Sequence, residues 1–127
     1  CIDVTAGYSI EDCKDANIEE GDIVLLKSGM SAHYYKPEYF LNYPVMTREF
    51  ADYLVAQKVK MVGLDTCSAD NAEGFPIHIK LLGNEILIIE NLTNLDSLPV
   101  QGFTLYALPI NLNLDGAPAR VIARVDT

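Results

Sequence analysis

Short apolar runs alternate with helical segments over the first hundred residues, and this alternation restricts the fold more than any other feature of the sequence. Residues 23–27 read Ile-Val-Leu-Leu-Lys and residues 86–89 read Ile-Leu-Ile-Ile. Unbroken apolar runs of this length are typical of strands that are buried on both faces, as in sheets covered by helices. The chain is therefore predicted to form an α/β layer structure with at least partly parallel strands.

Turn residues and helix caps set the expected bounds of the elements. The expected strands are residues 2–5, 23–27, 61–65, 86–89, 103–108 and 120–125. The expected helices are residues 9–16, 48–58 and 75–82, with Ser9 and Thr47 as N-caps and Gly83 just past the third helix. On that third helix Phe75, His78 and Leu82 share a face. Since no clear helix separates the last two strands, the sheet is expected to be mixed.

Residues 30–44 form a long connection without a helical or strand period. The segment contains five aromatic residues, two prolines and His33. Long connections in compact domains often carry function. The other interpretation is a loop whose aromatic side chains cover the core.

Composition and charge exclude several classes of protein. The 127 residues fit one domain, residues 1–127. A net charge of −9 argues against nucleic acid or an anionic membrane as a partner, and no apolar run approaches the ~18 residues of a membrane span. Three widely spaced cysteines fit neither a disulfide framework nor a zinc finger, so reduced thiols and a cytoplasmic location are expected. No Met opens the chain, and we expect residues to be missing in front of Cys1.

Acidic residues follow two of the expected strands. Asp65 and Glu90 stand at strand ends, and His78 lies one short element before Glu90. Ligands gather at the carboxyl ends of strands in open α/β sheets, and imidazole with carboxylate suits zinc or manganese. The alternative is a hydrogen-bonded structural histidine and a carboxylate that serves as a cap or lies on the surface.

Other catalytic patterns are poorer. The sequence has no G-x-S-x-G, P-loop, G-x-G-x-x-G or H-E-x-x-H motif. A dyad of Cys67 with His33 or His78 stays open, as does an N-terminal nucleophile at Cys1.

Five pieces of sequence, in order along nearly the whole chain, resemble a known family. They are residues 21–29 (GDIVLLKSG), residues 62–66 (VGLDT) with Ser68 and Asp70, His78 with Leu81-Leu82, residues 86–92 (ILIIENL), and Pro109 with residues 115–120 (DGAPAR). They resemble the "Putative cyclase" family of metal-dependent hydrolases, which includes bacterial kynurenine formamidases and isatin hydrolases.

The resemblance implies a fold, a chemistry and a ligand pair. The fold is a swivelling β/β/α domain, and the activity is hydrolysis of amide or formamide bonds in small, often cyclic or aromatic molecules. One or two divalent ions, zinc or manganese, are the implied cofactors. His78 and Glu90, twelve residues apart, match two of the family's metal ligands. No residue is assigned as catalytic, and the substrate-binding residues are unknown.

One family signature has no counterpart here. The N-terminal His-x-Gly-Thr-His-x-Asp-x-Pro stretch is absent, so the chain looks like the C-terminal part of a cyclase/formamidase-like hydrolase domain. Two hypotheses follow. In the first, the intact protein is a metal-dependent amidohydrolase that uses metal-activated water on a small-molecule substrate, and this piece alone is inactive. In the second, the chain is a non-catalytic remnant or binding module with an incomplete metal site.

Two further expectations concern geometry and assembly. We expect the His78 ring and the Glu90 carboxylate within roughly 3–6 Å of each other, in one crevice with Asp65 at a neighbouring strand end. We expect these residues alone to bind metal weakly. A sheet that lacks part of its domain exposes edges and apolar surface, so we also expect a homo-oligomer.

Overall fold

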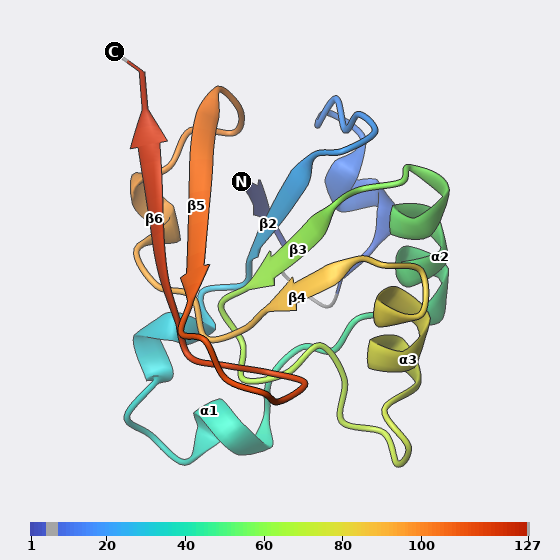
Figure 1. Cartoon of the computed structure of the whole chain (residues 1–127), viewed down its shortest axis with the longest axis vertical. Helices are drawn as coiled ribbons and strands as arrows, with labels where there is room; N and C mark the ends of the chain where they lie inside the picture. Colours follow the sequence, from blue (N-terminus) through green and yellow to red (C-terminus); the bar gives the residue numbers. More distant parts are fainter. Residues whose placement is uncertain (5–7, 127) are drawn as a thin grey trace.

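The computed structural model describes residues 1–4 and 8–126, arranged in three layers. A four-stranded sheet forms the middle layer (Figure 1). Helices lie on one side of this sheet, and a two-stranded hairpin lies on the other. The predicted α/β layer structure is confirmed, in the β/β/α order that the family resemblance implies.

The central sheet is entirely parallel, and its strands stand in sequence order, β1-β2-β3-β4. They are β1 (Ile2–Asp3), β2 (Ile23–Lys27), β3 (Met61–Leu64) and β4 (Leu87–Ile89). Residue Leu25 pairs with Gly63, and Gly63 pairs with Ile89. Because every strand runs in the same direction, the carboxyl ends of β3 and β4 meet at one edge. The expected end of the first strand, Thr5, lies outside the described residues.

Two helices cover one face of the sheet and form the main core with it. They are α2 (Arg48–Ala56) and α3 (Pro76–Leu82). The Thr47 hydroxyl accepts from the Phe50 amide at 3.1 Å, which confirms the predicted N-cap. α2 ends two residues before the expected Lys58. Phe50, Leu54 and Leu81 are fully buried in this core.

The face of α3 that Phe75, His78 and Leu82 share is not the one packed in the core. Ile77 and Leu81 face the core, whereas Phe75 and Leu82 are at least half exposed. Gly83 has an ordinary helical φ of −65°, so it is not a left-handed residue beyond the helix. Its side-chain position is crowded instead, because a Cβ there would lie 2.6 Å from the Ile79 carbonyl oxygen.

The last two strands form a separate antiparallel hairpin. They are β5 (Phe103–Pro109) and β6 (Ala119–Val125), with Leu105 opposite Ala123. The expected single mixed sheet is therefore wrong for the described residues: the four-stranded sheet is entirely parallel, and the two-stranded sheet is antiparallel. β5 and β6 pair with each other across the connection formed by residues 110–118, and within the described residues β4 has no antiparallel neighbour.

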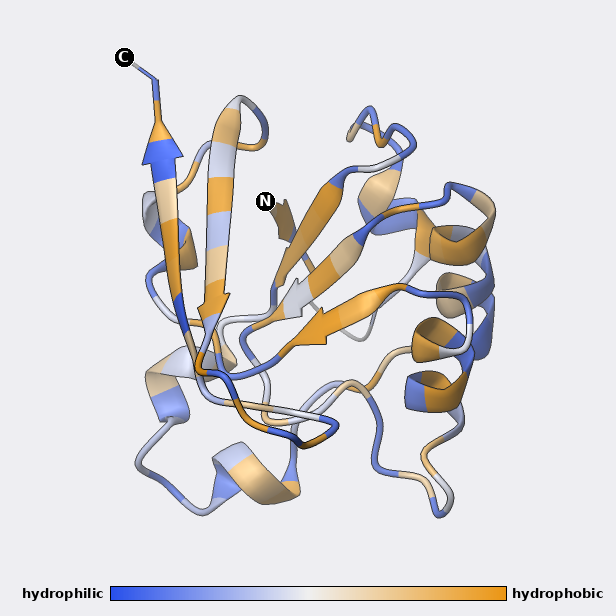
Figure 2. Ribbon diagram, in the orientation of Figure 1, coloured by the Kyte–Doolittle hydropathy of each residue, from blue (hydrophilic) through white to orange (hydrophobic). Residues whose placement is uncertain are grey.

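The hairpin covers the face of the sheet opposite the helices. A second apolar cluster joins the two layers, with the 3-10 helix η3 (Leu95–Ser97) beside it. Its members are Leu25, Leu92 and Leu95 with Cys1, Ile23, Ile89, Leu98, Phe103, Leu105 and Val121. Figure 2 shows apolar and polar residues alternating along β5, while β2 and β4 are more uniformly apolar. β2 is buried on both faces, which accounts for its uniformly apolar sequence, whereas β5 buries one face and β4, at the sheet edge, is only partly buried.

Three short helical turns complete the chain: η1 (Ile10–Cys13), η2 (Met30–His33) and α1 (Glu38–Leu41). η1 is shorter than the expected helix, and the Ser9 amide donates to Asp12 Oδ2 at 3.0 Å, as in the predicted capping box. The expected irregular connection over residues 30–44 contains η2 and α1. Tyr39 is fully buried there, and its ring packs edge-on against Tyr34. No helix of the described ranges is both long and apolar enough to cross a bilayer.

Candidate metal centre

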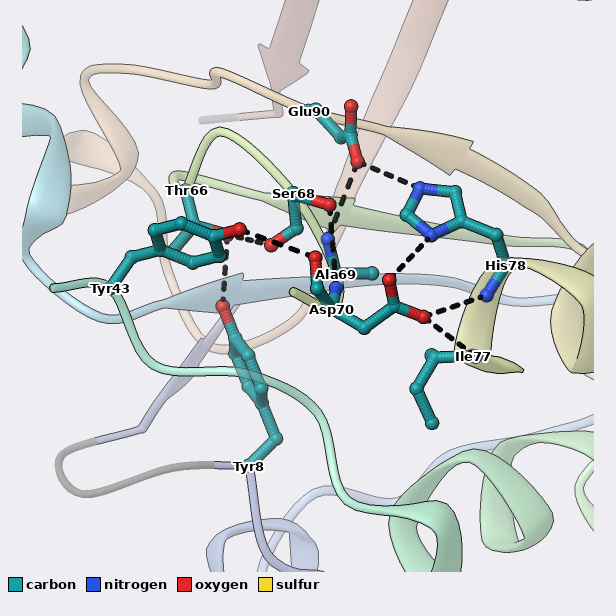
Figure 3. A network of polar contacts seen from close by, with 9 residues as sticks. All are labelled: Tyr8, Tyr43, Thr66, Ser68, Ala69, Asp70, Ile77, His78 and Glu90. Carbon is teal, nitrogen blue, oxygen red and sulfur yellow. Dashed lines mark hydrogen bonds and ion pairs between the residues drawn. The ribbon is translucent and has the colours of Figure 1, made fainter. Parts of the chain in front are cut away.

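His78 and Glu90 meet at the carboxyl edge of the sheet. His78 is in the first turn of α3, and Glu90 directly follows β4. The ring Nε2 lies 3.1 Å from Glu90 Oε1, as Figure 3 shows. This distance agrees with the expected separation. The two side chains are 24% and 29% exposed, so solvent and small molecules can reach the pair.

The backbone around Glu90 is fixed by neighbouring elements. Asn91, the next residue, has a left-handed φ of 61°, and its amide donates to the Thr66 carbonyl oxygen at 2.9 Å. The Asn91 side chain accepts from the Tyr39 hydroxyl at 2.8 Å. Glu90 is therefore held between the end of β3 and the aromatic segment before α2.

Residues 66–70, here called the β3 loop, connect the end of β3 to both members of the pair. The Ala69 amide donates to Glu90 Oε1 at 3.3 Å. The loop is shaped from within by the Thr66 hydroxyl, which donates to the Ser68 carbonyl oxygen at 2.9 Å. Thr66 is also hydrogen-bonded at 3.3 Å to the hydroxyl of Tyr8, whose pKa is raised by burial.

Asp70, the last residue of the β3 loop, lies behind His78. It is 4% exposed. Its Oδ2 accepts from the amides of Ile77, at 2.7 Å, and His78, at 3.3 Å. Its Oδ1 lies 3.3 Å from His78 Nδ1. Sequence reasoning gave Asp70 no role, because it stands six residues before α3 and outside the usual N-cap spacing.

Asp65 follows β3 as expected, but it does not join the pair. It is fully buried. Its Oδ1 accepts from the Ser28 amide and hydroxyl at 2.9 and 2.6 Å, and its Oδ2 accepts from the Gly29 amide at 2.8 Å. Both oxygens therefore serve the turn after β2, and Asp65 stands at the neighbouring strand end, as expected, without a hydrogen bond or ion pair to His78 or Glu90 among the described residues.

The cysteine alternatives find no support in the described part of the chain. The Cys67 thiol contacts the Tyr39 carbonyl oxygen at 3.6 Å, and no hydrogen bond joins it to either imidazole among the described residues. Burial raises the pKa of this thiol, which works against the thiolate that a nucleophile needs. The Cys1 amine donates to the Val100 carbonyl oxygen at 2.6 Å.

The pair fits part of a metal site. Two ligands of a tetrahedral ion, each about 2.1 Å from it, lie about 3.4 Å apart, close to the observed separation of His78 and Glu90. A carboxylate behind the second ring nitrogen, as Asp70 provides, is usual for a metal-binding histidine. Within residues 1–4 and 8–126, no Lys or Arg forms an ion pair with Asp70 or Glu90. The same residues contain no group of three or more His, Cys, Asp or Glu placed to hold an ion.

Comparison with known proteins identifies the family. A family model described as "Putative cyclase" matches residues 1–71. The chain belongs to the cyclase family. This confirms the resemblance drawn from the sequence.

Two curated proteins resemble this cyclase-family chain over almost all of its length. An uncharacterized protein of Methanocaldococcus jannaschii is 36% identical over 121 residues, which cover 92% of this chain and 62% of that protein. A kynurenine formamidase of Bacillus cytotoxicus is 30% identical over 128 residues, covering 97% and 60%. The chain thus spans about three-fifths of the length of these relatives.

Solved structures share the fold. One described as a potential metal-dependent hydrolase with cyclase activity has a TM-score of 0.78 and 30% identity, covering 94% of this chain and 60% of that one. Isatin hydrolase A from Labrenzia aggregata has a TM-score of 0.82 and 26% identity, covering 95% and 54%. The cyclase-family chain is therefore similar to proteins named as hydrolases, and to one named as metal-dependent.

Proposed function

We propose that the complete protein is a metal-dependent amidohydrolase that cleaves an amide or formamide bond in a small aromatic or cyclic molecule. The observation that carries this proposal is the approach of His78 Nε2 to Glu90 Oε1, at 3.1 Å, on the accessible edge of the sheet. The names of the relatives, a kynurenine formamidase and isatin hydrolases, support the substrate class.

In this proposal His78 and Glu90 hold a divalent ion, zinc or manganese. When bound, such an ion lowers the pKa of a water molecule towards about 7 and polarises the substrate carbonyl group. Glu90 contributes a negative charge that forms no ion pair with a Lys or Arg of the described residues. His78 contributes one ring nitrogen, while Asp70 faces the other. The β3 loop fixes the separation of the two ligands through Ala69 and Asp70.

A catalytic zinc usually takes three ligands from protein. We therefore propose that further ligands come from outside residues 1–127, and that these residues alone are inactive. A cytoplasmic location and a homo-oligomeric state stay predictions.

The test uses the complete protein, its bound metal measured by mass spectrometry, and release of formate from an N-formyl arylamine. We expect His78→Ala and Glu90→Gln each to weaken zinc binding at least tenfold and to abolish hydrolysis. His33→Ala is the matched control, because it removes the other histidine of the chain and should leave both properties unchanged. Chelation should abolish the activity, and zinc or manganese should restore it.

Two outcomes would contradict the proposal in different ways. If both variants keep the metal and the hydrolysis, the assignment of His78 and Glu90 is wrong. If the wild-type protein neither binds zinc or manganese nor releases formate, the alternative of a non-catalytic binding module is favoured.

A further inference from the structure

We propose that Asp70 is a positioning residue of the metal centre, which holds the His78 ring so that Nε2 faces the ion. This inference rests on the proposed function, because metal binding by His78 is its premise. It adds a residue to which neither the sequence pattern nor the names of the relatives assign a role.

The first argument is the different use of the two Asp70 oxygens. Oδ2 caps the first turn of α3 by accepting from the Ile77 and His78 amides. Oδ1 is turned to the ring of His78, 3.3 Å from Nδ1 (Figure 3). A helix cap needs only one acceptor oxygen, so capping does not account for the second contact.

The second argument is the burial of the two facing atoms. Asp70 Oδ1 and His78 Nδ1 are both buried, and in the described part of the chain neither has a hydrogen bond to any other group. Buried polar atoms are almost always paired in native proteins. A small rotation of the ring gives both atoms a partner at once, with Nδ1–H donating to the carboxylate.

The proton on Nδ1 decides which nitrogen is free. Both ring nitrogens face a carboxylate, Nδ1 that of Asp70 and Nε2 that of Glu90. With an ion between Nε2 and Glu90, Nε2 must offer its lone pair, so the ring proton is on Nδ1, where an Asp70 oxygen can only accept it. Second partners of this kind fix the ring and its proton in metal-binding histidines.

The third argument is that adjacent residues of the β3 loop bind both candidate ligands. Ala69 donates its amide to Glu90, and Asp70 contacts His78. The loop therefore sets the position of one ligand relative to the other, which a cap of α3 alone would not require.

Asp70→Asn separates the two roles. The amide has one oxygen, which the short bond from the Ile77 amide would keep at the helix end. The NH₂ group would then face Nδ1 and force that nitrogen to accept, which moves the ring proton to Nε2. Asp65→Asn is the control for loss of fold stability alone, because Asp65 is also a buried carboxylate beside β3 but its bonds within the described residues go to Ser28 and Gly29, away from the metal centre.

The experiment measures the zinc Kd of the complete protein by competition with a chelator, for wild type, Asp70→Asn, Asp65→Asn and His78→Ala. We expect Asp70→Asn to raise the Kd roughly 10–100-fold and Asp65→Asn to leave it within about twofold. Circular dichroism should show that Asp70→Asn keeps its helix content. Side-chain ¹H–¹⁵N NMR of the zinc-loaded wild type should show the ring proton of His78 on Nδ1, a reading that requires no variant to fold.

The outcomes distinguish this inference from the proposed function. If His78→Ala leaves the zinc Kd unchanged, the proposed ligand is wrong and the role of Asp70 falls with it. If His78→Ala weakens binding but Asp70→Asn does not, Asp70 is only a helix cap and this inference alone is overturned. A ring proton on Nε2 in the zinc-loaded wild type would also overturn it.

Discussion

Neutralising Asp65 should destabilise the fold strongly although the side chain stays the same size. In the structure this buried carboxylate accepts three hydrogen bonds, two at Oδ1 and one at Oδ2. In Asp65→Asn one oxygen is replaced by NH₂, which faces a backbone N–H in place of an acceptor. The Gly29 amide, or the two Ser28 donors, would then lose their partner.

The size of the effect follows from these contacts. A hydrogen bond to a charged group contributes about 1.5–3 kcal/mol to stability and a neutral one about 0.5–1.5 kcal/mol. Asp65→Asn loses the bond at Oδ2 and leaves the two bonds at Oδ1 with a neutral acceptor, so the total cost exceeds that of one hydrogen bond to a charged group. The smaller desolvation cost of a buried amide offsets part of this loss. We expect a decrease of about 2–4 kcal/mol in the free energy of unfolding.

Urea denaturation measures the effect. With a slope of about 2 kcal/mol per molar urea, the midpoint should fall by about 1–2 M. Asp96→Asn is the control, because Asp96 is exposed and its side chain binds, in the described part of the chain, Lys27 Nζ alone; its loss should cost at most about 1 kcal/mol. A decrease for Asp65→Asn no larger than that for Asp96→Asn would refute the reasoning.

Two further predictions concern packing and pH. Gly63→Ala should lower the free energy of unfolding by about 1–3 kcal/mol in urea denaturation, because its Cβ would lie 2.5 Å from Leu25 Cδ2. Gly116→Ala is the control and should have little effect, because its Cβ would have nothing within 4 Å. Equal losses for the two variants would contradict this prediction. Burial raises the pKa of the Cys13 thiol from 9.0 to about 11, so the unfolded chain loses this proton first as the pH rises. Stability should therefore fall between about pH 9 and pH 11. Urea midpoints should decline less for Cys13→Ala, and parallel declines would show that Cys13 is not responsible.

The strands could be predicted because each is an apolar run bounded by turn residues, as for residues 23–27. The buried face of α3 could not, since Pro-Ile-His-Ile-Lys-Leu-Leu is apolar nearly all round and its spacing favours no face. The separation of the hairpin into its own sheet was also missed. Whether an added strand joins a sheet edge or packs across a face depends on packing between residues distant in the sequence, such as that of Leu105 against the cluster of Leu25, Leu92 and Leu95.

The candidate site was predictable where chain order alone decides it. Glu90 follows from the rule that side chains after parallel strands meet at one edge, whereas His78 lies in α3 and was assigned as its partner through the family resemblance. That rule also placed Asp65 there, but it does not say which neighbour a strand-end carboxylate will bond. Ser28 and Gly29 offer Asp65 three donors, and the sequence gives no sign of this. The role of Asp70 depends on a loop that turns back to α3, which no periodicity predicts.

The groups of the candidate centre come from one uninterrupted stretch, residues 69–90. The segment of this stretch that joins Asp70 to α3 is open to solvent. Residues 71–75 are all exposed, and Gly74 has a φ of +79°. A protease that cuts within these five residues would leave the core strands of the parallel sheet intact. It would, however, remove the short covalent connection between Asp70 and His78, so that their alignment would rest on the packing of α3 and on the polar contacts between them. An intact chain at residues 71–75 is therefore needed to keep Asp70 and His78 linked, although these five residues contribute no group to the candidate centre.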